Sequence, residues 1–385
     1  MKILYIHTYY QQKGGEDAVF QQEYTLLDQA AEVQILTFQN KPGWRGAVQF
    51  FLSLWNVFAC EKLKDRIQLF QPDIIHVHNW HFAIGPIVIR AAKKRNIPVI
   101  LTLHNYRLLC PSATLSYKGR LFTDSVEASF PWKAIRNKAY RNSSLQTFWL
   151  AFIIWFHKRI GTWQLVDRYI VLTEFSKSIF GASSLNIASE KLVVKPNFVD
   201  RPDSKGTGTD PKGFLFIGRL SEEKGIRILL DAFRLTNCTL GIGGEGPLKN
   251  EVLKACKENK NIKYIGNLDK SEVDRAMMEY QVLIFPSTWY EGMPMTILEA
   301  FASGLPVISS NLGAMASMIR HGYNGLHFEP GNTEDLMDKL SYWQTLTETQ
   351  KANYRRNAHA TFLEHYMPEK NKERLLEIYH SVAGK

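Results

Sequence analysis

The segment VLIFPSTWYEGMPMTILEAFASGLPVISS, residues 282–310, reads as a strand, a helix and a second strand in succession. VLIFP is a short continuous apolar run, as expected of a parallel strand covered on both faces. Pro294 suits the first position of a helix, because the N–H that proline lacks is not needed there. Gly304 and Pro306 end the helix, and PVISS forms the next strand. The segment therefore predicts a βαβ unit.

The same alternation extends over most of the chain. Strand-like runs lie at 2–7, 32–38, 73–78, 98–104, 167–173, 191–195, 213–218, 238–243, 262–266, 282–286 and 306–310. A stretch rich in Pro, Gly, Ser and Thr interrupts the series, and only helical patterns follow residue 330. We predict an α/β protein with two Rossmann-like domains that face each other across a cleft. The expected boundaries are 1–199 for the first domain, 200–212 for the linker and 213–366 for the second.

Composition narrows the class of protein. The chain has 385 residues, 45% of them hydrophobic, and a formal net charge of +10. This charge admits nucleic acid, an anionic membrane surface or phosphorylated small molecules as partners. The four cysteines are far apart and form no CxxC pair. Because no secretory signal is seen either, we expect reduced thiols in a cytoplasmic protein, without a zinc site or disulfides.

The quoted segment also predicts an anion site in the second domain. The amides of Met295, Thr296 and Ile297 open the helix at the carboxyl end of a strand, where they can bind a negatively charged group. Glu291 lies in the preceding loop and Glu299 on the second turn. Eight residues at 100° each would leave the two carboxylates about 80° apart on a helix, so we interpret them as separate acceptors for hydroxyl groups.

Two glycine-containing loops precede this segment. GFLFIGRLSEEKG ends its strand at Gly218, and Arg219 and Lys224 follow where both can reach a phosphate. LGIGGEGPL, which contains Gly244, matches G-x-G-x-x-G literally. The strand about 20 residues on lacks the acidic residue of a dinucleotide site, so a tight turn near a nucleotide is favoured over an NAD(P) site.

The first domain offers weaker signals. Gly14 and Gly15 follow the first strand and allow backbone amides to approach a phosphate. His104 ends a strand, either as a functional residue or as a hydrogen-bonded strand-end histidine. His76, His78 and His81 form HxHxxH, but no carboxylate or cysteine lies nearby in the sequence. We therefore expect no metal site there.

One segment departs from the alternation. Residues 147–163 include nine consecutive apolar residues, Phe148 to Phe156, too few to cross a bilayer as a helix. A second aromatic stretch covers 44–58. Basic residues surround the apolar run at 147–163: Lys133, Arg136, Lys138, Arg141, Lys158 and Arg159. Two interpretations stay open for 131–163, core helices or helices lying in a membrane interface.

The E-x7-E pattern in EGMPMTILEAFASGLPVISS, preceded by IGRLSEEKG and GGEGPL, resembles glycosyltransferase family 4, a group of GT-B enzymes. The resemblance covers nearly the whole chain, including the Gly-Gly loop, TLHNYR and PNFVD. It implies that Glu291 contacts hydroxyls of the transferred sugar and that Glu299 holds the ribose. It also implies that Arg219 and Lys224 neutralise the diphosphate, that Gly15 approaches the phosphate, and that His104 lies beside the sugar.

The family resemblance implies a retaining, metal-independent enzyme without a cofactor, whose last helix, about 367–385, packs on the first domain. Many relatives have Phe-Gly where this chain has Met293-Pro294. We expect a glycosyltransferase that moves a sugar from a nucleotide-diphosphate sugar to a glycan or lipid-linked acceptor in cell-surface polysaccharide synthesis. An anionic membrane surface at the inner face of the membrane is an expected partner, and nucleic acid is not. The alternatives are a GT-B sugar-nucleotide epimerase and a non-catalytic nucleotide-sugar-binding or nucleic-acid-binding protein.

Overall fold

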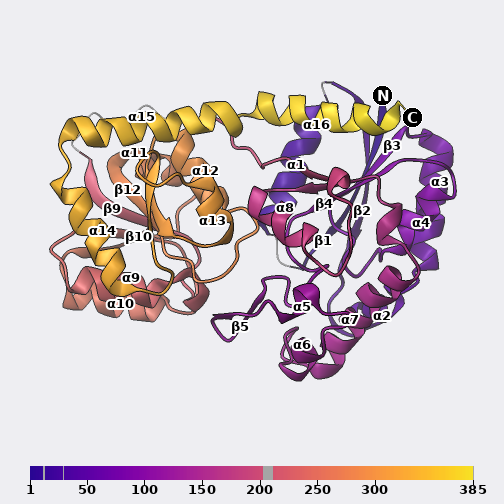
Figure 1. Cartoon of the computed structure of the whole chain (residues 1–385), viewed down its shortest axis with the longest axis horizontal. Helices are drawn as coiled ribbons and strands as arrows, with labels where there is room; N and C mark the ends of the chain where they lie inside the picture. The colour runs from indigo at the N-terminus through magenta and orange to yellow at the C-terminus, as the bar shows by residue number, and fades with distance from the viewer. Residues whose placement is uncertain (12–13, 29, 203–210, 385) are drawn as a thin grey trace. The chain divides into compact units, whose positions relative to one another are not determined.

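The computed structural model describes residues 1–11, 14–28, 30–202 and 211–384 (Figure 1). The chain divides into two compact units. Unit 1 comprises Met1–Tyr117, Phe122–Pro196 and Asn371–Lys385, and unit 2 comprises Lys118–Leu121 and Asn197–Lys370. Most of the predicted linker, 200–212, lies outside the described residues, because 203–210 are not among them.

Unit 1 is built on a parallel sheet with the strand order β2-β1-β3-β4-β7-β8. Its strands are β1 (Lys2–Tyr9), β2 (Glu32–Gln39), β3 (Ile74–Val77), β4 (Val99–Leu103), β7 (Arg168–Val171) and β8 (Leu192–Val194). Both Ile3 and Leu4 are fully buried although successive side chains point to opposite faces. Helices therefore cover both faces of the sheet, which explains its continuous apolar strands.

The helices of unit 1 are α1 (Gly15–Leu27), α2 (Gly43–Leu52), α3 (Val57–Phe70), α4 (Ile87–Lys93), α5 (Asp124–Glu127), α6 (Trp132–Arg136), α7 (Ser144–Arg159), α8 (Glu174–Gly181) and most of α16 (Pro368–Ala383). One core cluster joins Ile3, Tyr5 and Phe20 with Leu375 and Tyr379 of the last helix. Helix α16 is thus an integral part of unit 1, although it ends the chain.

Unit 2 repeats the plan with the strand order β11-β10-β9-β12-β13-β14. Its strands are β9 (Lys212–Ile217), β10 (Leu240–Gly243), β11 (Ile262–Gly266), β12 (Tyr280–Phe285), β13 (Val307–Ser310) and β14 (Gly325–Phe328). Its helices are α9 (Ile226–Arg234), α10 (Lys249–Glu258), α11 (Lys270–Glu279), α12 (Met295–Ala302), α13 (Gly313–Met318), α14 (Thr333–Thr345) and α15 (Glu348–His365). Helices α9, α10 and α14 bury apolar side chains against one face of this sheet.

The short elements are β5 (Ser116–Tyr117) and β6 (Arg120–Leu121), which pair with each other, and the 3-10 turns η1 (Trp163–Leu165), η2 (Ser189–Lys191) and η3 (Glu222–Lys224).

Each sheet has a point where the strand order reverses. In unit 1 the chain runs from β1 outward to β2 and then returns to β3 on the other side of β1. In unit 2 the same reversal occurs between β9 and β12. In open parallel sheets, ligands bind at the carboxyl ends of the strands beside such a point. The loops that follow these strands are therefore the first places to look for a site.

The predicted strands are confirmed, with shifts of one or two residues at their ends. Strand β14 was not predicted, because Gly325 and His327 interrupt its apolar pattern and it is only four residues long. The predicted position of Pro294 is wrong by one residue. Pro294 is the N-cap of α12, with an extended ψ of 110°, and the helix begins at Met295.

Helix α7 contains the apolar run Phe148–Phe156, and every residue of that run is at least partly buried. The exposed aromatic side chains of unit 1 lie mainly in the other stretch, 44–58. Trp44 is 74% exposed, Phe51 65% and Phe58 67%. In the described part of the chain, no helix is both long and apolar enough to cross a membrane. All four cysteines lie in this part and are unpaired.

Candidate functional site

In unit 2, backbone contacts tie the loop after β9 to the loop after β12. The Thr288 amide donates to the Glu223 carbonyl at 2.9 Å. Gly225 has a positive φ of 73°, and a Cβ there would lie 2.0 Å from the Pro286 carbonyl oxygen. Only glycine permits this close approach. The two loops at the reversal point are therefore held in a fixed relation.

This arrangement pairs two residues predicted to act in the site. Lys224 Nζ donates to Glu291 Oε1 at 2.6 Å, and the two side chains are 20% and 11% exposed. The same carboxylate oxygen accepts from Ser287 Oγ and Trp289 Nε1, both at 2.7 Å. Lys224 Nζ also lies 5.4 Å and 5.7 Å from the ring centroids of Phe285 and Trp289. The cation is thus held at the carboxyl end of β12 by a carboxylate and two aromatic faces.

The start of α12 contributes backbone donors beside this pair. The first amides of a helix have no acceptor within the helix, which applies to Met295 and Thr296. Ile297 was predicted to present a third free amide, and this is wrong. Its N–H donates to the Pro294 carbonyl at 3.1 Å, because the first turn closes tightly behind the proline. Of the three predicted amides, those of Met295 and Thr296 remain candidates for binding an anion.

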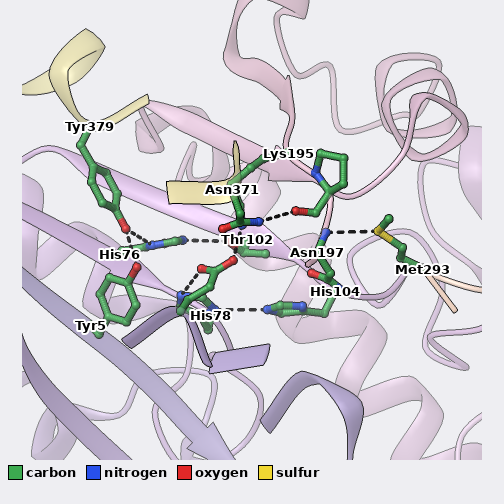
Figure 2. Close-up of polar contacts among 12 residues, drawn as sticks. Tyr5, His76, His78, Thr102, His104, Lys195, Asn197, Met293, Asn371 and Tyr379 are labelled. Carbon is green, nitrogen blue, oxygen red and sulfur yellow. Dashed lines mark hydrogen bonds and ion pairs between the residues drawn. The ribbon is translucent and has the colours of Figure 1, made fainter. Parts of the chain in front are cut away.

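Met293, at one of the positions where many relatives have Phe-Gly, is buried in unit 2. Its sulfur accepts from the Asn197 amide at 3.2 Å (Figure 2). Met295 Sδ lies 3.5 Å from the side-chain nitrogen of the same asparagine. The methionines therefore join the PNFVD segment to the start of α12.

Glu299 lies apart from the Lys224–Glu291 pair. It is partly buried, and its Oε1 is 3.4 Å from Lys270 Nζ. Burial raises the pKa of Glu299 above its ordinary value, an effect that nearby Lys270 opposes. The two glutamates form separate ion pairs, one with Lys224 and one with Lys270.

Gly218 and Gly244 bring the loops after β9 and β10 into contact. The Gly218 amide donates to the Gly243 carbonyl at 3.1 Å, and a Cβ on Gly244 would lie 2.0 Å from the Gly218 oxygen. Gly244 has a φ of 129°. The glycine motif thus allows the backbones of these two loops to approach each other closely, as the sequence indicated. Arg219 follows Gly218 with an exposed side chain.

In unit 1, Gly14 and Gly15 form the start of α1. Gly14 is the N-cap, and its amide donates to Asp17 Oδ2 at 2.9 Å. Apart from chain neighbours, no atom of the described residues lies within 4 Å of a Cβ built on either glycine. A ligand can therefore approach the backbone here, although Asp17 already binds one of the amides.

His104 lies just beyond β4 and contacts His78. The His78 Nδ1–His104 Nε2 distance is 3.3 Å, and the rings stack with centroids 5.5 Å apart (Figure 2). Burial, followed by the charges of His7 and Lys195, lowers the pKa of His104 to about 3. His104 is therefore neutral at physiological pH and can donate or accept a hydrogen bond, but it does not supply a positive charge. It lines a small cavity together with Glu16, Asn105 and Arg107.

The HxHxxH interpretation requires a correction. A carboxylate does lie nearby, because α1 brings Glu23 over the sheet to within 4.8 Å of ligand atoms of His76 and His78. His76 uses both ring nitrogens, with Tyr379 Oη at 2.8 Å and Thr102 Oγ1 at 2.7 Å (Figure 2). Glu23 forms an ion pair with Lys195. These donors and acceptors favour a buried hydrogen-bond network over a metal site.

Several residues of the site were missed from the sequence. Ser287 and Trp289 could have been found, because they follow a strand at the reversal point of the sheet. Lys270 and Lys195 give no local signal, since each meets its glutamate only in the folded chain.

Two family models match adjacent parts of this chain. The model described as Glycosyltransferase Family 4 covers residues 5–201, and the one described as Glycosyl transferases group 1 covers residues 200–361. An uncharacterized glycosyltransferase of Methanocaldococcus jannaschii is 24% identical over 73% of this chain and 69% of its own length. The alpha-monoglucosyldiacylglycerol synthase of Acholeplasma laidlawii is 23% identical over 78% of this chain and 73% of its own. The chain spans about two thirds of the length of the first three curated relatives it matches, 64–73%.

Among solved structures, Anabaena Alr3699/HepE in complex with UDP has a TM-score of 0.68 and 18% identity, covering 99% of this chain and 100% of its own. The same protein has also been solved with UDP-glucose. This likeness establishes the fold as GT-B, with two Rossmann-like units. The first family model alone covers more than half of the chain, and the two together cover nearly all of it. The chain therefore belongs to glycosyltransferase family 4 and is a glycosyltransferase.

Proposed function

We propose that the protein transfers a sugar from a nucleotide-diphosphate sugar to a glycan or lipid-linked acceptor, with retention of configuration. The observation that carries the proposal is the Lys224–Glu291 pair beside the N-terminus of α12. A cation and free amides at one strand end suit a diphosphate. The names of relatives support the two substrates, since Alr3699/HepE binds UDP-glucose and the Acholeplasma enzyme synthesises a glucosylated diacylglycerol.

The proposed reaction breaks the bond between the anomeric carbon and the diphosphate oxygen. The leaving diphosphate takes the electron pair, and Lys224, Arg219 and the α12 amides stabilise its charge. The acceptor hydroxyl attacks from the same face and passes its proton to a leaving phosphate oxygen. Glu291 contacts sugar hydroxyls and also holds Lys224 in place. His104 serves as a neutral hydrogen-bonding partner for the sugar, and we propose that no metal or cofactor is needed.

The two glutamates should differ in their effects on ligand binding. Glu299→Gln is expected to weaken binding of the nucleoside diphosphate about tenfold or more, since a hydrogen bond to a charged group contributes roughly 1.5–3 kcal/mol. Glu291→Gln should spare the nucleoside diphosphate, because the amide oxygen can still accept from Lys224, and should weaken only the sugar-bearing donor. Calorimetric titration of both variants with both ligands checks this. Equal losses for the bare diphosphate would contradict the assignment.

The same titrations have a pH dependence. Protonating Glu299 removes its negative charge, so wild-type affinity should fall as pH falls through the pKa of Glu299. Because burial raises that pKa, the loss should begin above the range of an ordinary glutamate. In Glu299→Gln, affinity should not show this loss at low pH, because the group that titrates is absent. The variant therefore serves as the control for the pH dependence of the wild type.

We also propose that α2 binds an anionic membrane. Trp44, Val48 and Phe51 recur at helical spacing and are all exposed, while no residue of α2 is buried. Phe51 stacks on Trp149 of α7 at 4.8 Å, so the face continues onto the neighbouring helix. The exposed Arg45, Arg136 and Arg159 supply positive charge in the same unit. An exposed apolar helix face with basic flanks suits an interfacial position.

The membrane proposal predicts co-sedimentation with anionic liposomes that weakens in high salt. Trp44→Ser with Phe51→Ser should reduce the bound fraction at least tenfold, because burying each aromatic side chain contributes about 1.5–3 kcal/mol. Leu235→Ser is the matched control, since Leu235 is 71% exposed but belongs to unit 2. If the double variant and the wild type sedimented equally, the proposal that α2 binds the membrane would be wrong.

A further inference from the structure

Glu23, His78 and His104 of unit 1 form a connected series that ends at the small cavity. Glu23 lies on α1, and the two histidines come directly after β3 and β4. Glu23 Oε2 is 3.6 Å from His78 Nε2, and His78 Nδ1 is 3.3 Å from His104 Nε2 (Figure 2). Glu23 and His78 are almost completely inaccessible, whereas His104 is partly buried and lines the cavity. The series therefore connects a buried carboxylate to the histidine proposed to face the sugar.

A buried cation keeps Glu23 as an acceptor. Lys195 Nζ donates to Glu23 Oε1, and both side chains are at most 1% exposed. A buried ammonium group is stabilised by a carboxylate partner, because a neutral carboxyl group would leave its charge uncompensated. The second carboxylate oxygen, Oε2, has no hydrogen-bond partner among the described residues, and neither does His78 Nε2. The position of the proton on His78 therefore depends on the carboxylate oxygen opposite it.

The carboxylate selects one of the two neutral tautomers of His78. Burial, followed by the charges of His76 and His104, lowers the pKa of His78, so its ring carries one proton. With that proton on Nδ1, the Nε2 lone pair would point at the Glu23 oxygen, and two acceptors would repel each other. With the proton on Nε2, a polar N–H meets a negative oxygen. The separation of 3.6 Å is longer than a hydrogen bond, but the electrostatic attraction persists at this distance.

The tautomer of His78 decides that of His104. Because His78 Nδ1 is left as an acceptor, the proton between the two rings belongs to His104 Nε2. His104, whose pKa is lowered to about 3, is neutral and has no second proton. Its Nδ1 is therefore an acceptor as well. This atom has no hydrogen-bond partner among the described residues, so a ligand can use it.

We infer that Glu23, acting through His78, fixes the tautomer of His104 so that its Nδ1 accepts a hydrogen bond from a hydroxyl of the donor sugar. The inference rests on the proposed function, because it assumes that His104 faces the sugar. Glu23 and His78 are positioning residues, since neither touches the substrate. The place beside His104 thus takes a hydroxyl that can donate. A carboxylate is disfavoured there, because its lone pairs would face the lone pair of Nδ1.

Nitrogen-15 NMR of the full chain, labelled at its histidines, tests the tautomer directly and needs no substrate. The chemical shift of each ring nitrogen shows whether it carries a proton, and the His104 signals are those absent from His104→Asn. In the wild type, His104 should carry its proton on Nε2 and none on Nδ1. A proton on Nδ1 instead would overturn the inference.

Glu23→Gln should move the protons of both histidines. Lys195 can only donate, so the new amide oxygen turns to Lys195 and the NH2 group donates to His78 Nε2. His78 then carries its proton on Nδ1, and His104 changes to the tautomer with a proton on Nδ1. Glu61→Gln, which removes an exposed carboxylate of the same unit, should leave His104 unchanged.

A purely structural role for Glu23 gives a different result. If Glu23 only balanced the charge of Lys195, Glu23→Gln would lower the stability of the fold without changing the tautomer of His104, and this outcome would overturn the inference. The wild-type spectrum decides the question if the variant does not fold.

Donor analogues that carry fluorine in place of one sugar hydroxyl at a time connect the tautomer to function. Fluorine cannot donate a hydrogen bond, so one of these replacements should lower kcat/KM of the wild type about threefold to tenfold, as expected for one neutral hydrogen bond. The same replacement should matter less in Glu23→Gln, whose His104 Nδ1–H donates. An equal effect in both proteins would contradict the inference. Consumption of no nucleotide sugar by the wild type would instead count against the proposed function, and the NMR result does not depend on it.

Discussion

Replacing Lys195 with methionine is expected to lower the free energy of unfolding by about 3–5 kcal/mol, because it leaves Glu23 as a buried charge without its cation. Both side chains are essentially inaccessible, at 0% and 1% exposed. Lys195 also donates to Asn371 Oδ1 at 3.3 Å, and Asn371 donates to the Pro196 carbonyl (Figure 2). Urea unfolding followed by circular dichroism measures the change.

Two further variants separate the buried charge from a general loss of packing. Glu23→Leu combined with Lys195→Met should recover most of the loss, since a buried ion pair can be replaced by apolar side chains at little cost. Lys254→Met is the exposed control, because its partner Glu258 is also exposed, and it should cost less than about 1 kcal/mol. A double variant no more stable than Lys195→Met would contradict this explanation.

Lys224→Met is expected to lower kcat by roughly 10²–10³-fold, the usual effect of removing one group that stabilises charge in a transition state. The fold should survive, because Ser287 and Trp289 still donate to Glu291. Steady-state kinetics on the donor that the chain uses, with or without acceptor, provide the measurement.

Lys254→Met again serves as control, as an exposed lysine of the same unit that is not placed in the site. Arg219→Gln should lower the rate as well, but by less, because this side chain is exposed and water screens its charge. A Lys224→Met enzyme with wild-type kcat would show that the lysine only positions Glu291.

The fold could be predicted because parallel strands are covered on both faces. Such strands appear as unbroken apolar runs, and the runs at 282–286 and 306–310 correspond closely to β12 and β13. The same rule fails for β14, whose His327 is only partly buried at the edge of the sheet. The start of α12 was misplaced by one residue, since a proline can cap a helix as well as open it.

The sequence could predict only those site residues that directly follow neighbouring strands of the sheet. Gly218, Lys224 and Glu291 come after β9 and β12, and their meeting follows from the sheet order. The partner of Glu23 could not be inferred, because Lys195 is 172 residues away in the sequence. For the same reason the sequence showed no carboxylate near HxHxxH, although Glu23 lies beside His76 and His78 in the folded chain.

Metal-free transfer with retention is tested most directly by proton NMR of the anomeric region while the chain is incubated with α-linked UDP-, GDP- and ADP-hexoses in EDTA. A metal-free retaining transferase should consume one donor class, release its nucleoside diphosphate and give the free sugar first as the α anomer. Consumption that requires added Mn²⁺, or first appearance of the β anomer, would contradict a metal-free retaining transferase.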